Sequence, residues 1–241
     1  MTRMNIVVGI LFTADHYDNV PFIPSLYPGI EMVFYGEQPN DDVLFVEHQR
    51  GIFSYRALID LASRYDRAGY MIAHDDFFLN WKTLSSLDPN RVWHQPYGLA
   101  TQTDLACWYW WGTPHGAPAY DRVAAALPVF STLGGICCGY SDLVYVPRRL
   151  IAKLTHVLKV TSDAELFVEL ALPNAIHAFT NPSDRCVLNT IDHCRFQYGT
   201  DEWMDLYRPD HHGVHPVKYS DPRNRHLAKL EAQRITRLLT D

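Results

Sequence analysis

The chain has 241 residues, and 21 lysines and arginines against 27 acidic residues give it a formal charge of −6. Hydrophobic residues make up 47% and charged residues 20%, a globular composition that argues against wholesale disorder. The acidic balance argues against a nucleic-acid partner, and the apolar run at 6–12 is far shorter than the roughly 20 residues of a membrane span. We expect one domain over residues 1–241, with no membrane span.

The cysteines and the N-terminal sequence indicate the compartment. The cysteines are odd in number and have no CxxC spacing, which favours reduced thiols over a disulfide framework or a zinc site. They are Cys107, Cys137, Cys138, Cys186 and Cys194. Acidic and aromatic residues directly follow the first apolar run, which argues against a signal peptide. These features favour a reducing compartment.

The first third of the chain alternates predicted strands with a predicted helix. Apolar, β-rich runs predict strands at 5–12, 31–35, 43–47 and 70–73. Helical spacing of apolar residues predicts a helix that begins at Ser54, a plausible N-cap, and ends at Gly69. Strand, helix and strand in this order predict an α/β fold, with a mostly parallel sheet flanked by helices.

The rest of the chain is predicted to be mainly helical, with one more strand at 143–146. Helices are expected at 120–127, from Pro147 to about 160, from about 162 to just before Pro173, and from Pro222 to the end. One side of the last helix carries Leu227, Leu230, Ile235 and Leu238. Residues 196–220 are expected to form a loop.

The triplet His74-Asp75-Asp76 directly follows the fourth predicted strand. Ligands of open α/β sheets bind beyond the carboxyl ends of the strands. Two adjacent carboxylates there need a cation or hydrogen-bond donors, and Mg²⁺ and Mn²⁺ prefer oxygen ligands. The alternative is that Asp75 or Asp76 caps a helix starting near Phe77.

A second polar segment, HPVK, spans His215 to Lys218. An imidazole can bind a metal ion and an ammonium group can neutralise a phosphate, so this segment could complete a site with the acidic pair. The alternative is an ordinary surface loop. The neighbouring His211 and His212 suit a solvated loop better than coordination.

Four segments together carry a resemblance to a known family: GYMIAHDDFFLNW, GGICCGYSDLVYVPRR, DAELFVELALPNAI and HPVKYS. In these segments the chain resembles GT-A-fold glycosyltransferases, in particular the STELLO-type and exostosin-like enzymes and related viral and bacterial transferases. The resemblance runs from about residue 5 to about residue 220. It implies a nucleotide-binding half at about 1–110, an acceptor half at about 111–220, and a C-terminal helix at 221–241.

The resemblance assigns the metal and the diphosphate to four residues. The triplet stands where the family carries its DxD motif, but His74 occupies the first position and is expected only near the nucleotide sugar. Asp76 would bind the metal directly, and Asp75 would contact the metal or the donor ribose. His215 would be a further metal ligand, and Lys218 would contact the diphosphate. The implied cofactor is Mn²⁺ or Mg²⁺.

Other residues would border the donor. The resemblance places Thr13 by the nucleotide base and Arg50 and Ser54 near the nucleotide. The alternatives are a strand end for Thr13 and a solvated surface charge for Arg50. Gly135 follows another glycine, and a glycine pair lets the backbone approach a donor sugar, although a plain turn is equally compatible.

Three carboxylates are candidates for the general base that deprotonates the acceptor hydroxyl. Glu165 matches the acidic position that faces the acceptor in inverting relatives, and Glu169 and Asp142 come next in order. The spacing of the two glutamates puts both on one helical face, which by default is solvated. The aromatic run at 107–111 could stack a glycan through Trp108, Trp110 and Trp111, and the alternative is core packing.

The sequence therefore predicts a metal-dependent glycosyltransferase that moves a sugar from a UDP-sugar, with UDP-xylose a candidate, to a glycan hydroxyl with inversion. Lacking a membrane anchor, it would be a cytoplasmic enzyme of bacterial or viral origin, or an excised catalytic domain. One alternative is a metal-dependent hydrolase of phosphoesters or nucleotide sugars, with a metal-activated water. Another is a non-catalytic carbohydrate-binding protein that uses the tryptophan run.

Overall fold

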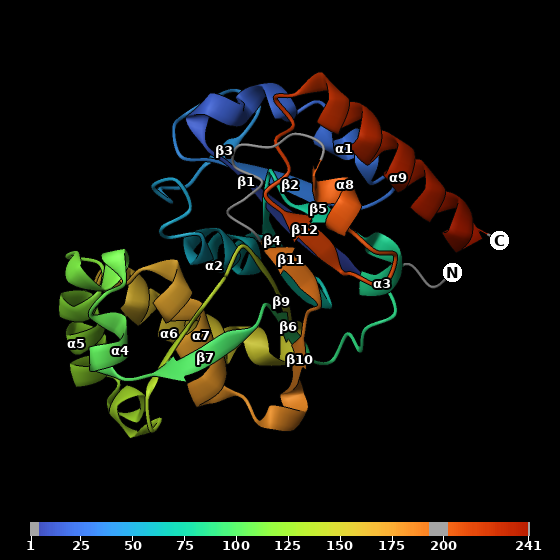
Figure 1. Ribbon diagram of the computed structural model, residues 1–241. Coiled ribbons are helices and arrows are strands. Elements are labelled where there is room, and N and C mark those ends of the chain that lie inside the picture. Colours follow the sequence, from blue (N-terminus) through green and yellow to red (C-terminus); the bar gives the residue numbers. More distant parts are fainter. Residues whose placement is uncertain (1–4, 193–201, 241) are drawn as a thin grey trace.

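A seven-stranded sheet forms the centre of the computed structural model, which describes residues 5–192 and 202–240 (Figure 1). In spatial order the strands are β10 (Arg185–Val187), β6 (Val92–His94), β9 (Leu143–Pro147), β4 (Gly69–His74), β1 (Ile6–Phe12), β2 (Met32–Gly36) and β3 (Leu44–Phe45). All of them run in one direction except β9, which is antiparallel to both of its neighbours. The predicted α/β class with a mostly parallel sheet is confirmed.

The apolar sequence of β1 explains its central position. All seven of its residues are buried, as expected for a strand covered on both faces. Because successive side chains point to opposite faces, Val7 and Leu11 join one hydrophobic core while Val8 and Ile10 join the other.

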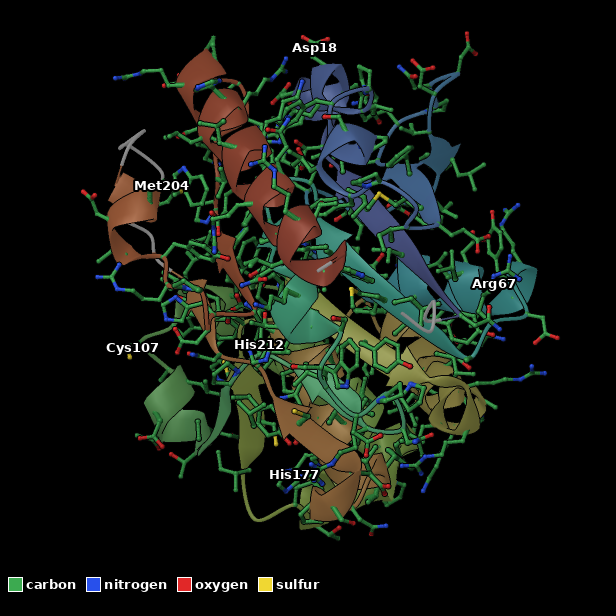
Figure 2. All side chains as sticks on the ribbon, turned by 90° about the vertical axis from the view of Figure 1, so that its right-hand side faces the viewer. Asp18, Arg67, Cys107, His177, Met204 and His212 are labelled. Carbon is green, nitrogen blue, oxygen red and sulfur yellow. The ribbon has the colours of Figure 1, made fainter. Side chains whose placement is uncertain are left out.

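Helices cover both faces of the sheet (Figure 1). One core receives side chains from α2 (Tyr55–Arg64), α5 (Ala117–Ala126), α6 (Arg148–Asp163) and α7 (Val168–Phe179). The other receives them from α1 (Ile23–Leu26), α3 (Trp81–Leu84), α8 (Glu202–Leu206) and α9 (Pro222–Thr240). Figure 2 shows Asp18 at one end of the molecule and His177, on α7, at the other.

Two small sheets extend the fold. In the first, β12 (Gly213–His215) lies between β11 (Thr190–Asp192) and β5 (Phe78–Leu79), and pairs with β5 in antiparallel register. In the second, β7 (Tyr97–Ala100) pairs with β8 (Ile136–Gly139), and α4 (Gln102–Leu105) follows β7. The first of these small sheets brings His215 beside the end of β4, where its ring centre lies 5.9 Å from that of His74.

The predicted end of the first long helix is wrong. Helix α2 ends at Arg64, Tyr65 is already extended, and Gly69 begins β4 instead of closing the helix. A glycine is required there because a Cβ atom would overlap the hydroxyl oxygen of Tyr145. The strand predicted at 43–47 is shorter, with two residues in β3.

The predicted boundary between the helix that starts at Pro147 and the helix that starts at about 162 is also wrong. Helix α6 continues to Asp163, and α7 starts at Val168 and runs through Pro173. A proline inside a helix removes one backbone hydrogen bond. In α7, eight residues including Pro173 are buried, and this burial offsets the loss.

The segment predicted as a loop at 196–220 contains α8 and β12, and its first part lies outside the described residues. The final helix is confirmed as α9, but Leu230 and Leu238 are exposed on it while Ala232 and Ile235 are buried. Only part of the apolar side that the leucine spacing predicts for this helix is therefore buried.

Four cysteines are free thiols: Cys107, Cys137, Cys138 and Cys186. Figure 2 shows Cys107 at the edge of the molecule, where its side chain is exposed. Cys194 lies outside the described residues. Within 5–192 and 202–240, no helix has both the length and the apolar character needed to cross a membrane.

Candidate functional site

The candidate site lies where the carboxyl end of β4 meets the start of β9 and the end of β12. His74 closes β4, and its backbone N–H donates to the carbonyl of Asp142 just before β9, at 3.1 Å. The backbone N–H of Val217 donates to the carbonyl of Asp76 at 2.6 Å. Because β12 pairs with β5, the HPVK segment is held against the triplet although about 140 residues separate them.

His74, Asp76 and His215 form a group suited to a metal ion. One potential ligand atom from each residue lies within 4.8 Å of the other two. The His215 Nε2 atom is 3.1 Å from the Asp76 Oδ1 atom. Two imidazoles and a carboxylate make a donor set that fits a divalent transition-metal ion. The structure thus brings together two of the three predicted metal ligands, Asp76 and His215, and adds His74 to them. The third, Asp75, is not in this group.

Asp142 and Lys218 flank this group. The carboxylate of Asp142 lies 3.2 Å from Nδ1 of His74 and 3.5 Å from Nδ1 of His215. The Nζ atom of Lys218 lies 3.3 Å from Oδ2 of Asp76. An anionic ligand bound at the metal would therefore meet an ammonium group at the rim.

The electrostatics of Asp76 favour its ionised form. Burial by itself would raise the pKa of Asp76, but the nearby His215, Lys218 and His74 outweigh burial and hold that pKa well below its usual range. A buried carboxylate that stays charged is prepared to bind a cation without first losing a proton.

Asp75 makes a different set of contacts. His16 Nδ1 lies 3.1 Å from its carboxylate, and Asn19 Nδ2 donates to it at 3.3 Å. Burial raises the pKa of Asp75, although the hydrogen bond with His16 opposes this shift. Asn19 in turn accepts from Arg225 at 2.9 Å. Asp75 thus links the turn after β1 to the start of α9, and its side-chain partners are not those of the metal group.

The helix-cap alternative for the acidic pair is wrong. The residues after Asp76 form β5, and the next helix, α3, starts later with Asn80 as its N-cap. The Asn80 side chain accepts from the backbone N–H of Thr83.

Ser54 precedes α2 as predicted, but its hydroxyl does not cap the helix. It lies 2.8 Å from Nε2 of His74 and donates to the carbonyl of Gly51 at 2.6 Å. Gln49, Arg50 and Gly51 before it all have positive φ angles, of 42°, 53° and 87°. Ser54 is thus brought into the site through a tight left-handed loop.

Arg50 and Thr13 lie at the rim. The Arg50 side chain is 75% exposed, and its guanidinium lies 3.6 Å from the carboxylate of Asp15. The carbonyl of Thr13 accepts from the backbone N–H of His16 at the start of the 3-10 turn after β1. Both residues therefore border the carboxyl end of the central strands.

The two glutamates do not share a helical face as predicted, because Glu165 lies between two helices and only Glu169 lies in one. Glu165 occupies the left-handed turn between α6 and α7, with φ 54°, and its carboxylate is 53% exposed and 3.9 Å from His115 Nδ1. Glu169 lies in the first turn of α7. The backbone N–H of Val168 donates to the carbonyl of Ile52, which ties the start of α7 to the loop beside His74.

The tryptophan run packs largely against the protein itself. Trp110 stacks on Phe167 with ring centres 4.6 Å apart, Trp108 lies 5.5 Å from the same ring, and Trp111 is buried against Tyr120. Gly135 lies just before β8, at the end of that strand away from Asp142.

Sequence reasoning missed His48 and His16. His48 is buried, and its Nδ1 accepts from the backbone N–H of Gly51 at 3.3 Å. Burial, together with the neighbouring His74, lowers the pKa of His48 to about 4. The sequence signal that could have found it is the glycine three residues later, which marks a tight turn before a helix.

A separate cavity of about 1080 Å³ opens at the other end of β1. Ile6, Leu26, Trp81 and Ile235 are among its lining residues. It contains none of the residues predicted for the site.

Comparison with known proteins shows a distant similarity. No family model matches the chain. In sequence it is similar to two Arabidopsis thaliana proteins, "Probable glycosyltransferase STELLO2" (20% identity over 211 residues) and "Probable glycosyltransferase STELLO1" (22% over 206), in each case over 80% of this chain and 27% of the relative.

Among solved structures, the galactosyltransferase LgtC with donor and acceptor sugar analogues aligns at a TM-score of 0.44 and 11% identity, covering 96% of this chain and 94% of LgtC. The bifunctional glycosyltransferase WbbM aligns at 0.45 and 12%, covering 98% of this chain and 52% of WbbM. The STELLO-type resemblance is confirmed: the chain is a distant sequence relative of the STELLO proteins and spans about a quarter of their length.

Proposed function

We propose that this chain is a metal-dependent glycosyltransferase that moves a sugar from a nucleotide-sugar donor to a glycan hydroxyl. The observation that carries the proposal is the convergence of His74, Asp76, His215 and Lys218 at the carboxyl edge of a mostly parallel sheet. The STELLO-type similarity supports the same reaction class.

The residues at this edge have separate tasks in the proposed reaction. His74, Asp76 and His215 would hold the divalent ion, which neutralises charge on a departing diphosphate. Lys218, whose Nζ atom lies 3.3 Å from Asp76, would neutralise charge on the same diphosphate. The rim residues Thr13 and Arg50 would border the nucleotide, for which a UDP-sugar, such as UDP-xylose, is our candidate.

A calorimetric titration tests the proposal directly. UDP should bind the wild-type protein at least tenfold more tightly with Mn²⁺ present than without it. Asp76→Asn should lose this enhancement, because the amide keeps the shape of the side chain but removes its charge. Asp121→Asn, an exposed aspartate of α5, is the control and should behave as wild type. UDP binding that is indifferent to the metal would refute the proposal.

The general base is the finer part of the proposal. Our candidates are Glu165, in the turn before α7, and Glu169, in its first turn, because the Asp142 carboxylate lies beside the two imidazoles proposed to bind the metal. We expect Glu165→Gln or Glu169→Gln to lower kcat about 100-fold or more while UDP affinity stays unchanged. We expect the product to have the inverted anomeric configuration, which proton nuclear magnetic resonance of the product would measure. Two fully active variants would remove both glutamates as candidates.

A metal-dependent hydrolase is the second candidate, favoured by the two imidazoles beside a carboxylate, which could also activate water. The two functions differ in their need for an acceptor. A transferase should consume its nucleotide sugar faster when a glycan acceptor is added, and a hydrolase should not.

A further inference from the structure

The hydroxyl of Ser54 determines which nitrogen of His74 carries a proton. Its one hydrogen is donated to the Gly51 carbonyl at 2.6 Å. Toward His74 Nε2, 2.8 Å away, the oxygen can therefore only accept a hydrogen bond. It follows that Nε2 is the protonated nitrogen and that Nδ1 of a neutral His74 carries the lone pair.

This lone pair faces a carboxylate. Nδ1 of His74 lies 3.2 Å from Oδ1 of Asp142, and both atoms are acceptors when the imidazole is neutral. Two acceptors at this distance repel each other unless a proton or a metal ion lies between or beside them. The second imidazole, of His215, is placed against the same carboxylate at 3.5 Å. The arrangement therefore requires positive charge at the Nδ1 side of His74.

The His74 ring is also held in place from behind. Gly51 has φ +87°, and a Cβ atom on it would lie 2.8 Å from Cε1 of His74. His48 fixes this loop, because its Nδ1 accepts from the Gly51 N–H and its carbonyl accepts from the Phe53 N–H at 3.0 Å. Partners of this kind behind a metal-binding histidine set its tautomer and its orientation.

We propose that Ser54 and Gly51 position His74 to bind the metal through Nδ1, and that the resulting nitrogen-rich site selects ions such as Co²⁺ and Zn²⁺ over Mg²⁺. Mg²⁺ prefers oxygen ligands, whereas imidazole suits the later first-row ions. This inference rests on the metal site of the proposed function but not on glycosyl transfer.

Metal affinities measured without nucleotide test the proposal. Calorimetry of the wild-type protein should give Co²⁺ an affinity at least about 100-fold above that for Mg²⁺. His74→Asp should reduce this ratio about tenfold or more, because it restores an oxygen ligand. Ser54→Ala should weaken Co²⁺ binding about tenfold, since outer partners of metal ligands typically contribute 10- to 100-fold. Ser63→Ala, an exposed serine on the same helix, should have no effect.

The visible absorption of bound Co²⁺ gives a second readout, and it should change in His74→Asp but not in Ser63→Ala. Equal wild-type affinities for Co²⁺ and Mg²⁺ would overturn the inference and leave the proposed transferase intact. No divalent binding at all would overturn both this inference and the proposed metal site. If His74→Asp fails to fold by circular dichroism, the wild-type ratio and Ser54→Ala decide the matter.

Discussion

The two adjacent aspartates, Asp75 and Asp76, have different side-chain partners. Asp76 faces His215 and Lys218, and Asp75 faces His16 and Asn19. The sequence resemblance predicts Asp76 as the direct metal ligand and leaves Asp75 between the metal and the donor ribose. It could not predict that Asp75 pairs with His16 and Asn19, because the direction of each side chain depends on the turn after β4, where the Phe77 N–H donates to the His74 carbonyl.

A second prediction at the scale of single residues concerns His48 and the pH dependence of the free energy of unfolding. Its pKa is lowered to about 4 in the folded protein, by burial and by His74, from 6.5. Between these two pH values the unfolded chain binds a proton at His48 and the folded protein does not. The free energy of unfolding should therefore fall as the pH drops from about 6.5 towards 4. The loss should reach about 3 kcal/mol.

Urea titrations of metal-free protein at several pH values measure this effect. His48→Asn keeps an acceptor near the Gly51 N–H and cannot titrate in this range, so its unfolding free energy should depend less on pH between 6.5 and 4. Parallel curves for the variant and wild type would contradict the assignment.

At the scale of elements, the sequence predicts those strands and helices whose stability depends mainly on their own residues. The strands β1 and β4 are continuous apolar runs whose burial follows from composition alone. Strand β12 has only three residues and exists through its pairing with β5, and α7 tolerates Pro173 because the fold buries it. Neither fact is visible in a short window of sequence.

The loop before α2 gives a prediction that separates backbone strain from site geometry. Gly51→Ala forces an alanine into positive φ and against the His74 ring, so it should lower stability and weaken Co²⁺ binding. Gly134 has φ +74°, and a Cβ atom added to it would meet no other atom within 4 Å. Gly134→Ala should therefore lower stability by roughly 1–2 kcal/mol and leave metal affinity unchanged. Equal metal affinities in the two variants would show that Gly51 does not position His74.

At the scale of the whole molecule, the site depends on segments that are far apart in sequence. His74, Asp142 and His215 arrive from β4, the start of β9 and β12, and only the folded sheet brings them together. The resemblance predicted Asp76, His215 and Lys218 as partners because it carries their spatial relation from other proteins. The role of His74 as a third member follows only from the three-dimensional arrangement.

Pulsed electron paramagnetic resonance of Mn²⁺ bound to the wild-type protein with UDP tests the proposed metal and diphosphate site most directly. We expect nitrogen coupling from imidazole together with phosphorus coupling from the diphosphate, because His74 and His215 lie beside Asp76 and Lys218. Bound Mn²⁺ that shows phosphorus coupling but no nitrogen coupling, or nitrogen coupling with no phosphorus, would contradict this site.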